Sequence, residues 1–220
     1  DLWRQIMANG FHQLGDAASG TTPADIFAFL KVCGRFAVPL PMAELLLGHS
    51  WAVAQLAPCE GLVSIGRQHG KQAIQVPWGR RAQRVFGVDE NSQVVCVADA
   101  PVCVQEGNNM AAEARDTIEL GPDTQQLTLS DDPFAQMALA RTNLMAGTLQ
   151  STLDLGLQFA AEREQFGRSI SKFQAIQHSL AVVAAEVAAA QRAADAGVDA
   201  LGTDRFIAEV AASKARVGEA

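Results

Sequence analysis

Five side chains between positions 163 and 174 have the types and spacing of a site for a phosphorylated ligand with a flat apolar ring. They are Arg163, Gln165, Phe166, Phe173 and Gln174. An arginine guanidinium binds phosphate oxygens through charge-assisted hydrogen bonds, glutamine amides donate further hydrogen bonds, and phenylalanine rings offer an apolar wall. We therefore predict a ligand site at this stretch of the chain.

The same residues also have structural interpretations. Phenylalanines such as Phe166 and Phe173 are most often core residues. Arg163 and Gln174 could equally form an ion pair or a cap at a helix end. The sequence is therefore compatible with a binding role and with a structural role.

The remaining chemically capable residues give weaker signals. His178 lies on a mostly apolar helical stretch, where a histidine is more often structural than catalytic, and Trp51 and Trp78 are interpreted as packing residues. The cysteines form no Cys-x-x-Cys pair and have no histidine at zinc-ligand spacing, so we expect buried thiols and no metal. They are Cys33, Cys59, Cys96 and Cys103.

The composition is that of a globular protein. Of the 220 residues, 49% are hydrophobic and 19% are charged, which is enough material for a sizeable core. A net charge of -7, a pI near 5.0 and the absence of clustered Lys and Arg argue against a nucleic-acid partner. Apolar runs are too short to cross a bilayer. We expect a cytoplasmic protein, and the start at Asp1 inside a helical pattern indicates a piece of a longer chain.

The site residues lie in a region with helical texture, residues 131–220, which we interpret as part of a helical bundle. A long helix is predicted to start at a cap on Ser130 or Asp131. Gly197 and Gly202 are predicted to bracket a loop before the last helix. The predicted helices cover residues 131–157, 170–187 and 207–220.

Two other zones precede the bundle. Residues 1–58 are predicted to form a partial helical domain with helices near positions 2–7, 23–32 and 42–57. Residues 59–130 carry short β-branched runs between turn residues, which predicts a small antiparallel β domain. Its expected strands are residues 62–65, 73–76, 84–88, 93–98, 102–105, 117–120 and 126–129, with turns at 89–91, 107–109 and 121–123. The predicted fold class is α+β, mainly α.

The order of zones and the residues of 159–181 together resemble the acyl-CoA dehydrogenase family. The stretch contains Arg-x-Gln-Phe-Gly from Arg163 to Gly167, followed at fixed spacing by Ile170, Gln174 and Leu180-Ala181. This long match is more specific than a short glycine motif, although acyl-CoA oxidases share parts of it. Weaker similarities lie in the other zones, at residues 3–11, 34–41, 76–78 and 115–117, and in the last predicted helix, at residues 212–215.

The resemblance implies a fold, a cofactor and an assembly. The fold is an N-terminal helical domain, a small β domain and a C-terminal bundle. The cofactor is FAD, and the residues at positions 163, 165, 166, 173 and 174 are expected to contact the ADP portion of an FAD bound mainly by a neighbouring subunit. The expected partners are an acyl-CoA substrate, further acyl-CoA dehydrogenase subunits in a homo- or hetero-oligomer, and an electron-transfer flavoprotein.

The chain also departs from the family pattern. The Thr-Glu-Pro-x-Ala-Gly-Ser and Trp-Ile-Thr segments that hold the flavin ring are not found. One family position for the catalytic Glu falls near Met137 and Ala138, which cannot act as bases, and the other lies beyond Ala220. The catalytic residue is therefore unknown, and Arg141 is a weak candidate for contact with the substrate. Such shortened chains resemble subunits of heteromeric acyl-CoA dehydrogenases, including those acting on steroid side chains.

Three functional hypotheses follow. The first is α,β-dehydrogenation of an acyl-CoA, with hydride transfer to FAD, by a homomeric or heteromeric enzyme. The second is a non-catalytic structural subunit that completes the FAD site of a catalytic paralogue. The third, a helical scaffold without a ligand, accounts for the alanine-rich helices but not for the spacing around Phe166-Gly167.

Overall fold

A computed structural model of the protein describes residues 2–16, 19–53, 56, 59, 61–91, 94–121 and 125–220. The chain forms two compact units. One comprises Asp1–Ile26 and Pro39–Met137, and the other comprises Phe27–Val38 and Ala138–Ala220. The division into three domains at 58/59 and 130/131 stays a prediction.

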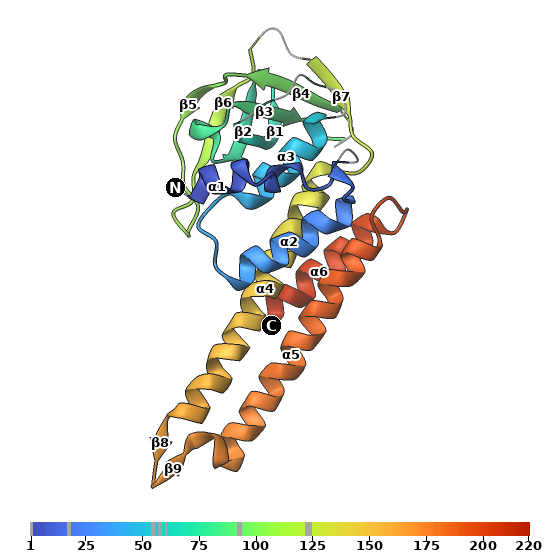
Figure 1. Ribbon diagram of the computed structural model, residues 1–220. Coiled ribbons are helices and arrows are strands. Elements are labelled where there is room, and N and C mark those ends of the chain that lie inside the picture. Colours follow the sequence, from blue (N-terminus) through green and yellow to red (C-terminus); the bar gives the residue numbers. More distant parts are fainter. Residues whose placement is uncertain are drawn as a thin grey trace. The chain divides into compact units, whose positions relative to one another are not determined.

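The first unit is built on a seven-stranded sheet with the strand order β5-β6-β2-β1-β3-β4-β7 (Figure 1). Each predicted strand is present, with ends that differ by no more than four residues. The strands are β1 (Val63–His69), β2 (Gln72–Pro77), β3 (Arg84–Val88), β4 (Val94–Asp99), β5 (Val102–Gln105), β6 (Arg115–Glu119) and β7 (Gln125–Thr128).

One pair of strands corrects the prediction of a purely antiparallel sheet. Strands β1 and β3 pair in parallel, with Val63 beside Arg84 and Arg67 beside Val88. Strand β2 returns antiparallel to β1 along one edge. A short 3-10 helix, η3 (Gly79–Arg81), then reverses the chain again, so β3 runs in the direction of β1 on its other side.

The core of the sheet is assembled from four strands and the residue after one of them. The members, all buried, are Ala73, Val76, Val85, Ala98, Ile118 and Leu120. Side chains alternate between the two faces of a strand, so residues three positions apart, such as Ala73 and Val76, would normally lie on opposite faces. A register shift in the β2–β6 pairing between them places both on the same face. The irregularity thus brings two residues three positions apart into one core.

Helical segments complete the first unit. They are α1 (Leu2–Ala8), η1 (Phe11–Gln13) and α3 (Met42–Val53). Helix α3 is buried from Met42 to Gly48, and apart from Glu44 these residues are apolar, as expected of a helix enclosed by the protein. A Cβ on Gly48 would meet the Val63 side chain at 2.5 Å, so this glycine lets α3 lie close against β1.

The second unit consists of long helices with a hairpin between two of them (Figure 1). Helices α2 (Pro23–Arg35) and α4 (Pro133–Glu162) begin in the first unit and continue in the second. They are followed by β8 (Glu164–Gln165), β9 (Arg168–Ser169), η4 (Ile170–Lys172), α5 (Gln174–Asp199) and α6 (Phe206–Glu219). An ion pair of 2.5 Å joins Lys31 to Asp195, and another of 2.5 Å joins Glu186 to Arg216.

Several helix ends differ from the predicted ones. The cap of α4 is Asp132 rather than Ser130 or Asp131, because its Oδ1 accepts hydrogen bonds from Phe134 N at 2.7 Å and Ala135 N at 3.0 Å. Residues 170–173 precede α5 instead of starting it. Gly197 lies inside α5, where a Cβ would meet the Leu139 Cδ1 atom at 2.6 Å, so it serves helix packing and not a loop.

The observed architecture confirms the predicted fold class, α+β and mainly α. Some predicted features lie outside the described residues. They are positions 54, 55 and 57 of the third helix, Gln93 of the fourth strand, Pro122 and Asp123 of a turn, and the side chain of Cys96.

Candidate functional site

The predicted site residues lie at the corner between α4 and α5, which we call the hairpin corner and define as residues 163–174. Strand β8 pairs with β9, with Glu164 opposite Ser169 and Gln165 opposite Arg168. The two turn residues between them, Phe166 and Gly167, have φ angles of 52° and 78°. Two consecutive left-handed residues are typical of a tight two-residue hairpin turn, which glycine adopts readily and phenylalanine rarely.

Hydrogen bonds fix the hairpin corner to the end of α4. Arg163 N donates to Phe159 O at 2.9 Å, and Ile170 N donates to Arg163 O at 2.8 Å. Ser169 Oγ donates to Ala160 O at 2.8 Å. These bonds account for the left-handed conformation of Phe166, because the backbone on both sides of the turn is held in place.

Two aromatic rings meet across the corner. The Phe166 and Phe173 centroids are 6.1 Å apart at an interplanar angle of 83°, an edge-to-face contact. The guanidinium carbon of Arg168 lies 4.4 Å from the Phe173 centroid, within cation–π range. Phe166 is 92% exposed, so it is presented to the surroundings instead of being buried as a core residue.

The polar residues of the predicted site are exposed and unused. Arg163, Gln165 and Gln174 are all exposed. Within the part of the chain that the structure describes, their side chains make no hydrogen bond or ion pair, so the alternative of an ion pair or cap at a helix end is not seen there. Three donor groups and an exposed ring are therefore available to a ligand on one corner.

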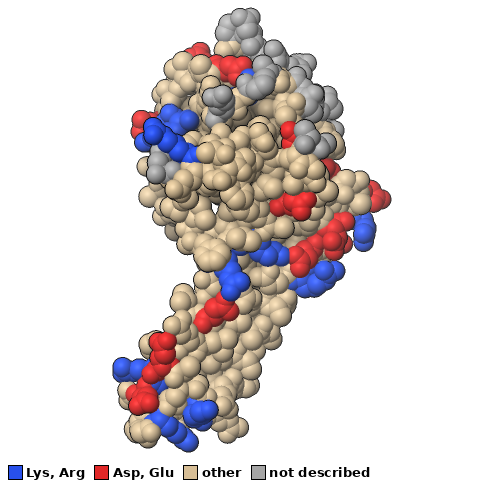
Figure 2. Space-filling view, in the orientation of Figure 1, with Lys and Arg blue, Asp and Glu red and all other residues tan. Residues whose placement is uncertain are grey.

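Figure 2 shows side chains of both charges gathered at this end of the long helices, beside uncharged surface. The basic residues there include Arg163, Arg168 and Lys172, and the acidic ones include Glu162 and Glu164. All five are exposed. The corner therefore offers cations to an anionic group although the chain as a whole is acidic.

The predicted substrate residue, Arg141, does not belong to the hairpin corner. It is half-buried in α4, about 30 Å along the helix axis from the end of α4 at Glu162. The nearby Met137 is 8% exposed and apolar, and Ala138 is half-buried, so neither of these positions supplies a carboxylate. A role for Arg141 with the substrate stays a prediction.

A second group of polar residues, not singled out from the sequence, surrounds Asp116 on β6. Its carboxylate is fully buried and accepts hydrogen bonds from Arg80 Nη2 at 2.6 Å, Arg80 N at 2.7 Å and Gly107 N at 3.1 Å. Burial acts to raise the pKa of Asp116, but these hydrogen bonds outweigh it and the pKa is lowered. Asp116 thereby fixes the start of η3, next to Trp78.

Trp78 was interpreted as a packing residue, and the structure adds a cavity beside it. Its φ of 55° is left-handed, and its Nε1 atom is buried with no hydrogen-bond partner among the residues that the structure describes. The cavity has a volume of about 450 Å³, within the range of small-molecule sites. Its described lining residues are Trp3, Pro39, Leu40, Pro41, Gly61, Leu62, Trp78 and Arg81. Four separate segments contribute them, so no local motif indicated the cavity.

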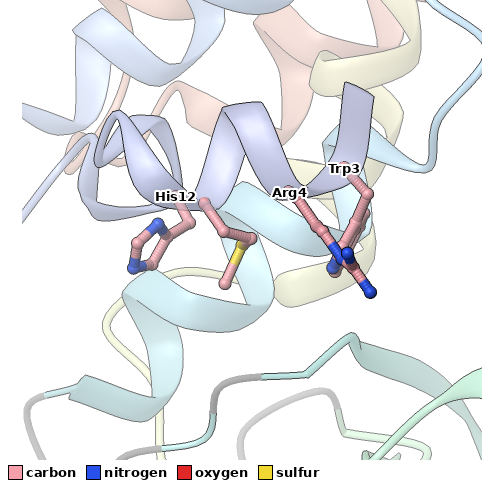
Figure 3. A pocket seen from close by; sticks show the side chains of 4 residues that line it. Trp3, Arg4 and His12 are labelled. Atoms are coloured by element: carbon pink, nitrogen blue, oxygen red, sulfur yellow. The ribbon is translucent and has the colours of Figure 1, made fainter. Parts of the chain in front are cut away.

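A further cavity of about 500 Å³ lies along α1 and η1, lined by Trp3, Arg4, Met7 and His12. Figure 3 shows Trp3, Arg4 and His12 projecting from the same side of these elements. The His12 ring meets His49 of α3 edge-to-face, with centroids 5.2 Å apart. Burial lowers the pKa of both histidines, and His12 lowers that of His49 further.

Glu44 is another residue that the sequence interpretation missed. It lies in α3 and is only 1% exposed. A signal was present, since this acidic residue interrupts the apolar run from Met42 to Leu47.

Among the described residues no group of three His, Cys, Asp or Glu is placed to hold a metal ion. None of the described helices has the combined length and apolarity of a membrane span.

Comparison with known proteins identifies relatives of the helical region. Residues 130–220 match the family model described as the C-terminal domain of acyl-CoA dehydrogenase. A probable acyl-CoA dehydrogenase, YngJ of Bacillus subtilis (strain 168), is 52% identical over 44 residues. That alignment covers 20% of this chain and 12% of YngJ.

Solved structures extend the likeness of fold to nearly the whole chain. The ChsE4-ChsE5 complex from Mycobacterium tuberculosis matches with a TM-score of 0.78 and 17% identity, covering 99% of this chain and 75% of that one. Butyryl-CoA dehydrogenase from Megasphaera elsdenii matches with a TM-score of 0.75 and 11% identity, covering 99% and 76%. PigA with FAD and proline has a TM-score of 0.73 and 13% identity, covering 99% and 75%.

Proposed function

Because residues 130–220 of this chain belong to the acyl-CoA dehydrogenase family, we propose that the chain is a subunit of a flavin-dependent acyl-CoA dehydrogenase. The hairpin corner contacts the ADP portion of FAD in this proposal. Three findings support this proposal: family membership, the common fold over 99% of the chain and the FAD named with the PigA structure. The observation that carries it is the set of exposed, unused donors beside the exposed ring of Phe166.

The side chains of the corner suit the chemistry of this ligand. Arg163 supplies a planar cation for a pyrophosphate, and Gln165 and Gln174 supply amide groups that both donate and accept hydrogen bonds. Phe166 supplies an apolar surface for an adenine or ribose edge. The edge-to-face contact with Phe173 orients this ring. Because the corner is held by backbone hydrogen bonds, binding requires little reordering of the protein.

The proposed reaction is α,β-dehydrogenation of an acyl-CoA thioester. FAD, when bound, supplies the hydride acceptor, and the enzyme must supply a base for the α proton. In the described part of α4, the position where the family carries such a base holds Met137 and Ala138. The base therefore comes from another part of the protein or from another subunit. We propose a homo- or hetero-oligomer, with an electron-transfer flavoprotein as a candidate electron acceptor.

A second candidate function is a non-catalytic structural subunit that completes the FAD site of a catalytic paralogue. The residues Met137 and Ala138 favour this candidate, because the chain can hold part of FAD at the hairpin corner while it contributes no base at these two positions. The ChsE4-ChsE5 structure, a complex of two differently named chains, supports a heteromeric arrangement. Both candidates place the same residues on FAD and expect a cytoplasmic protein.

The test measures FAD retention and flavin reduction. The chain is purified alone and together with any homologue encoded beside it, loaded with FAD and mixed with acyl-CoA thioesters while flavin absorbance is followed. Bleaching by this chain alone supports an independent enzyme. Bleaching only with the homologue supports a heteromeric enzyme, in which substitution of the homologue's catalytic Glu identifies the source of the base.

The Arg163→Ala variant tests the corner itself. Loss of a charge-assisted hydrogen bond of about 1.5 kcal/mol weakens FAD binding by about tenfold. Arg205→Ala is the control, because Arg205 is also an exposed arginine and lies beyond the other end of α5, where it pairs with Glu209 of its own chain. If no preparation binds FAD, the proposed function is wrong. If Arg163→Ala binds FAD as tightly as Arg205→Ala, the assignment of the corner is wrong.

A further inference from the structure

The cavity beside Trp78 has an apolar body and a single charged lining residue. Two indoles, those of Trp3 and Trp78, line it together with Leu40 and Leu62. Among its described lining residues Arg81 alone carries a charge. The cavity lies within the first unit, apart from the residues proposed to contact FAD.

The two neighbouring arginines of η3 have different surroundings. Arg80 is engaged by the Asp116 carboxylate at 2.6 Å and by Glu106 at 2.5 Å, so its charge is balanced within the protein. Arg81 is exposed, and within the described part of the chain its guanidinium has no hydrogen bond or ion pair. An unbalanced cation at an apolar cavity is suited to an anionic group of a ligand.

The main chain at Arg81 is held in place by the protein before any ligand binds. Arg81 N donates to Trp78 O at 2.9 Å, and Trp78 N donates to Ala114 O at 3.1 Å. Arg80 N donates to the buried Asp116 at 2.7 Å. The turn that carries Trp78 and Arg81 is therefore tied to Ala114 by a main-chain hydrogen bond and to the Asp116 side chain of β6 by another, which is the kind of preorganisation that a binding site requires.

We propose that this cavity binds a free monocarboxylate with an apolar body, with the body between Trp3 and Trp78 and the carboxylate on Arg81. One planar guanidinium matches one carboxylate. A phosphate ester or nucleotide would need further cations or clustered amide donors, which the described lining does not provide. This proposal goes beyond the dehydrogenase function and does not depend on flavin binding.

The test uses the tryptophans as reporters. Two of the three tryptophans of the chain line the cavity, whereas Trp51 donates to Gln136 elsewhere in the unit. Decanoate, decanol and decanoyl-CoA are titrated into the whole flavin-free chain while tryptophan emission is recorded. We expect decanoate to bind about three- to fivefold tighter than decanol at low salt, the gain typical of an exposed ion pair, and less so at high salt.

Variants assign the signal to the cavity. Arg81→Gln is expected to remove the advantage of decanoate over decanol, while Lys71→Gln, which removes an exposed cation from the same unit, preserves it. Leu40→Phe fills the cavity and is expected to weaken both probes. Trp51→Phe should leave the emission change intact.

Three outcomes would overturn the proposal. Equal binding of decanoate and decanol that Arg81→Gln leaves unchanged excludes the carboxylate. If decanoyl-CoA binds more tightly than decanoate and Arg81→Gln does not change this, the cavity binds the acyl chain of a thioester and not a free carboxylate. No change in emission with any probe excludes an apolar ligand site. None of these results depends on flavin, so they are distinct from failure of the dehydrogenase function.

Discussion

Gly147 of α4 and Gly34 of α2 lie where the main chains of these two helices touch. A Cβ built on Gly147 would collide with the carbonyl oxygen of Lys31 and approach Arg35 N to 2.8 Å. A Cβ on Gly34 would collide with the carbonyl oxygen of Leu144. Each helix therefore presents a glycine to the backbone of the other, and no side chain fits between them.

We expect Gly147→Ala to destabilise the protein by about 1–2 kcal/mol. Overpacking against backbone atoms costs roughly 1–3 kcal/mol, and the gain of about 1 kcal/mol in helix propensity only partly offsets it. Urea unfolding followed by far-UV circular dichroism gives the free energy of unfolding. The control is Gly156→Ala in the same helix, where a Cβ would meet only Leu180 Cδ2 at 3.8 Å.

Gly156→Ala is expected to be neutral or to stabilise the helix by up to about 1 kcal/mol. Opposite signs for the two substitutions would identify the helix crossing as the cause. Equal effects of the two alanines would contradict a close approach of α2 and α4 at Gly147.

At the residue scale, the sequence shows which side chains could bind a ligand but does not predict their surroundings. Arg163 and Phe166 could be chosen from their spacing, but the left-handed backbone and full exposure of Phe166 could not. The role of Gly147 depends on a helix more than a hundred residues earlier in the chain. Trp78 was interpreted as a packing residue, whereas the cavity beside it requires segments that only the fold brings together.

At the scale of elements, local patterns predicted the strands and the long helices, whereas pairing and termination depended on tertiary context. The β1–β3 pair is parallel because of the path of the chain through β2 and η3. The alternation of apolar and polar residues within one strand does not indicate the direction of the strand beside it. Gly197 was assigned to a loop from its residue type. It lies inside α5 and faces Leu139 and Ser213, so a glycine is required there because larger side chains would clash.

The contact between η1 and α3 makes stability depend on pH. Burial lowers the pKa values of His12 and His49, with Asp16 acting in the opposite direction on His49. Below about pH 6.5 the unfolded chain therefore binds more protons at these sites than the folded protein does. Their contribution to stability is complete above that pH and is lost progressively as the pH falls below it, towards the lowered pKa values of the folded protein.

We expect the free energy of unfolding to decrease from pH 7.5 to 5.5, by at most about 1.4 kcal/mol per pH unit for each histidine. Urea unfolding at a series of pH values measures this slope. The double variant His12→Gln, His49→Gln should show a flatter profile, and the exposed His69→Gln should follow the unchanged protein. A double variant with the original slope would show that other groups cause the dependence.

At the scale of the whole molecule, apolar side chains collect near the hairpin corner. They lie on the last turns of α4, at the turn and on the first half of α5. Their exposed fractions are 63% for Leu155, 48% for Leu157, 61% for Phe159, 92% for Phe166, 50% for Val182 and 41% for Val183. Groups of exposed large apolar residues are typical of surfaces that other proteins cover.

We expect the chain to associate with itself or with a homologue through this surface. Leu155 and Phe159 lie one turn apart on α4, so the double variant Leu155→Glu, Phe159→Glu places two charges on one face. Sedimentation equilibrium should show a larger species for the unchanged protein and a dissociation constant raised by at least about tenfold for the variant. The control is Val102→Glu, which changes an equally exposed apolar residue on β5. A monomer before substitution, with and without the homologue, would contradict this expectation.

The distribution of aromatic residues has an optical consequence. All three tryptophans, Trp3, Trp51 and Trp78, belong to the first compact unit, and the chain contains no tyrosine. Absorbance and emission excited near 280 nm therefore come almost wholly from the sheet-containing unit. The helical unit is nearly dark at that wavelength and contributes chiefly to the far-UV signal, so the two halves of this fold can be observed separately without attaching any label.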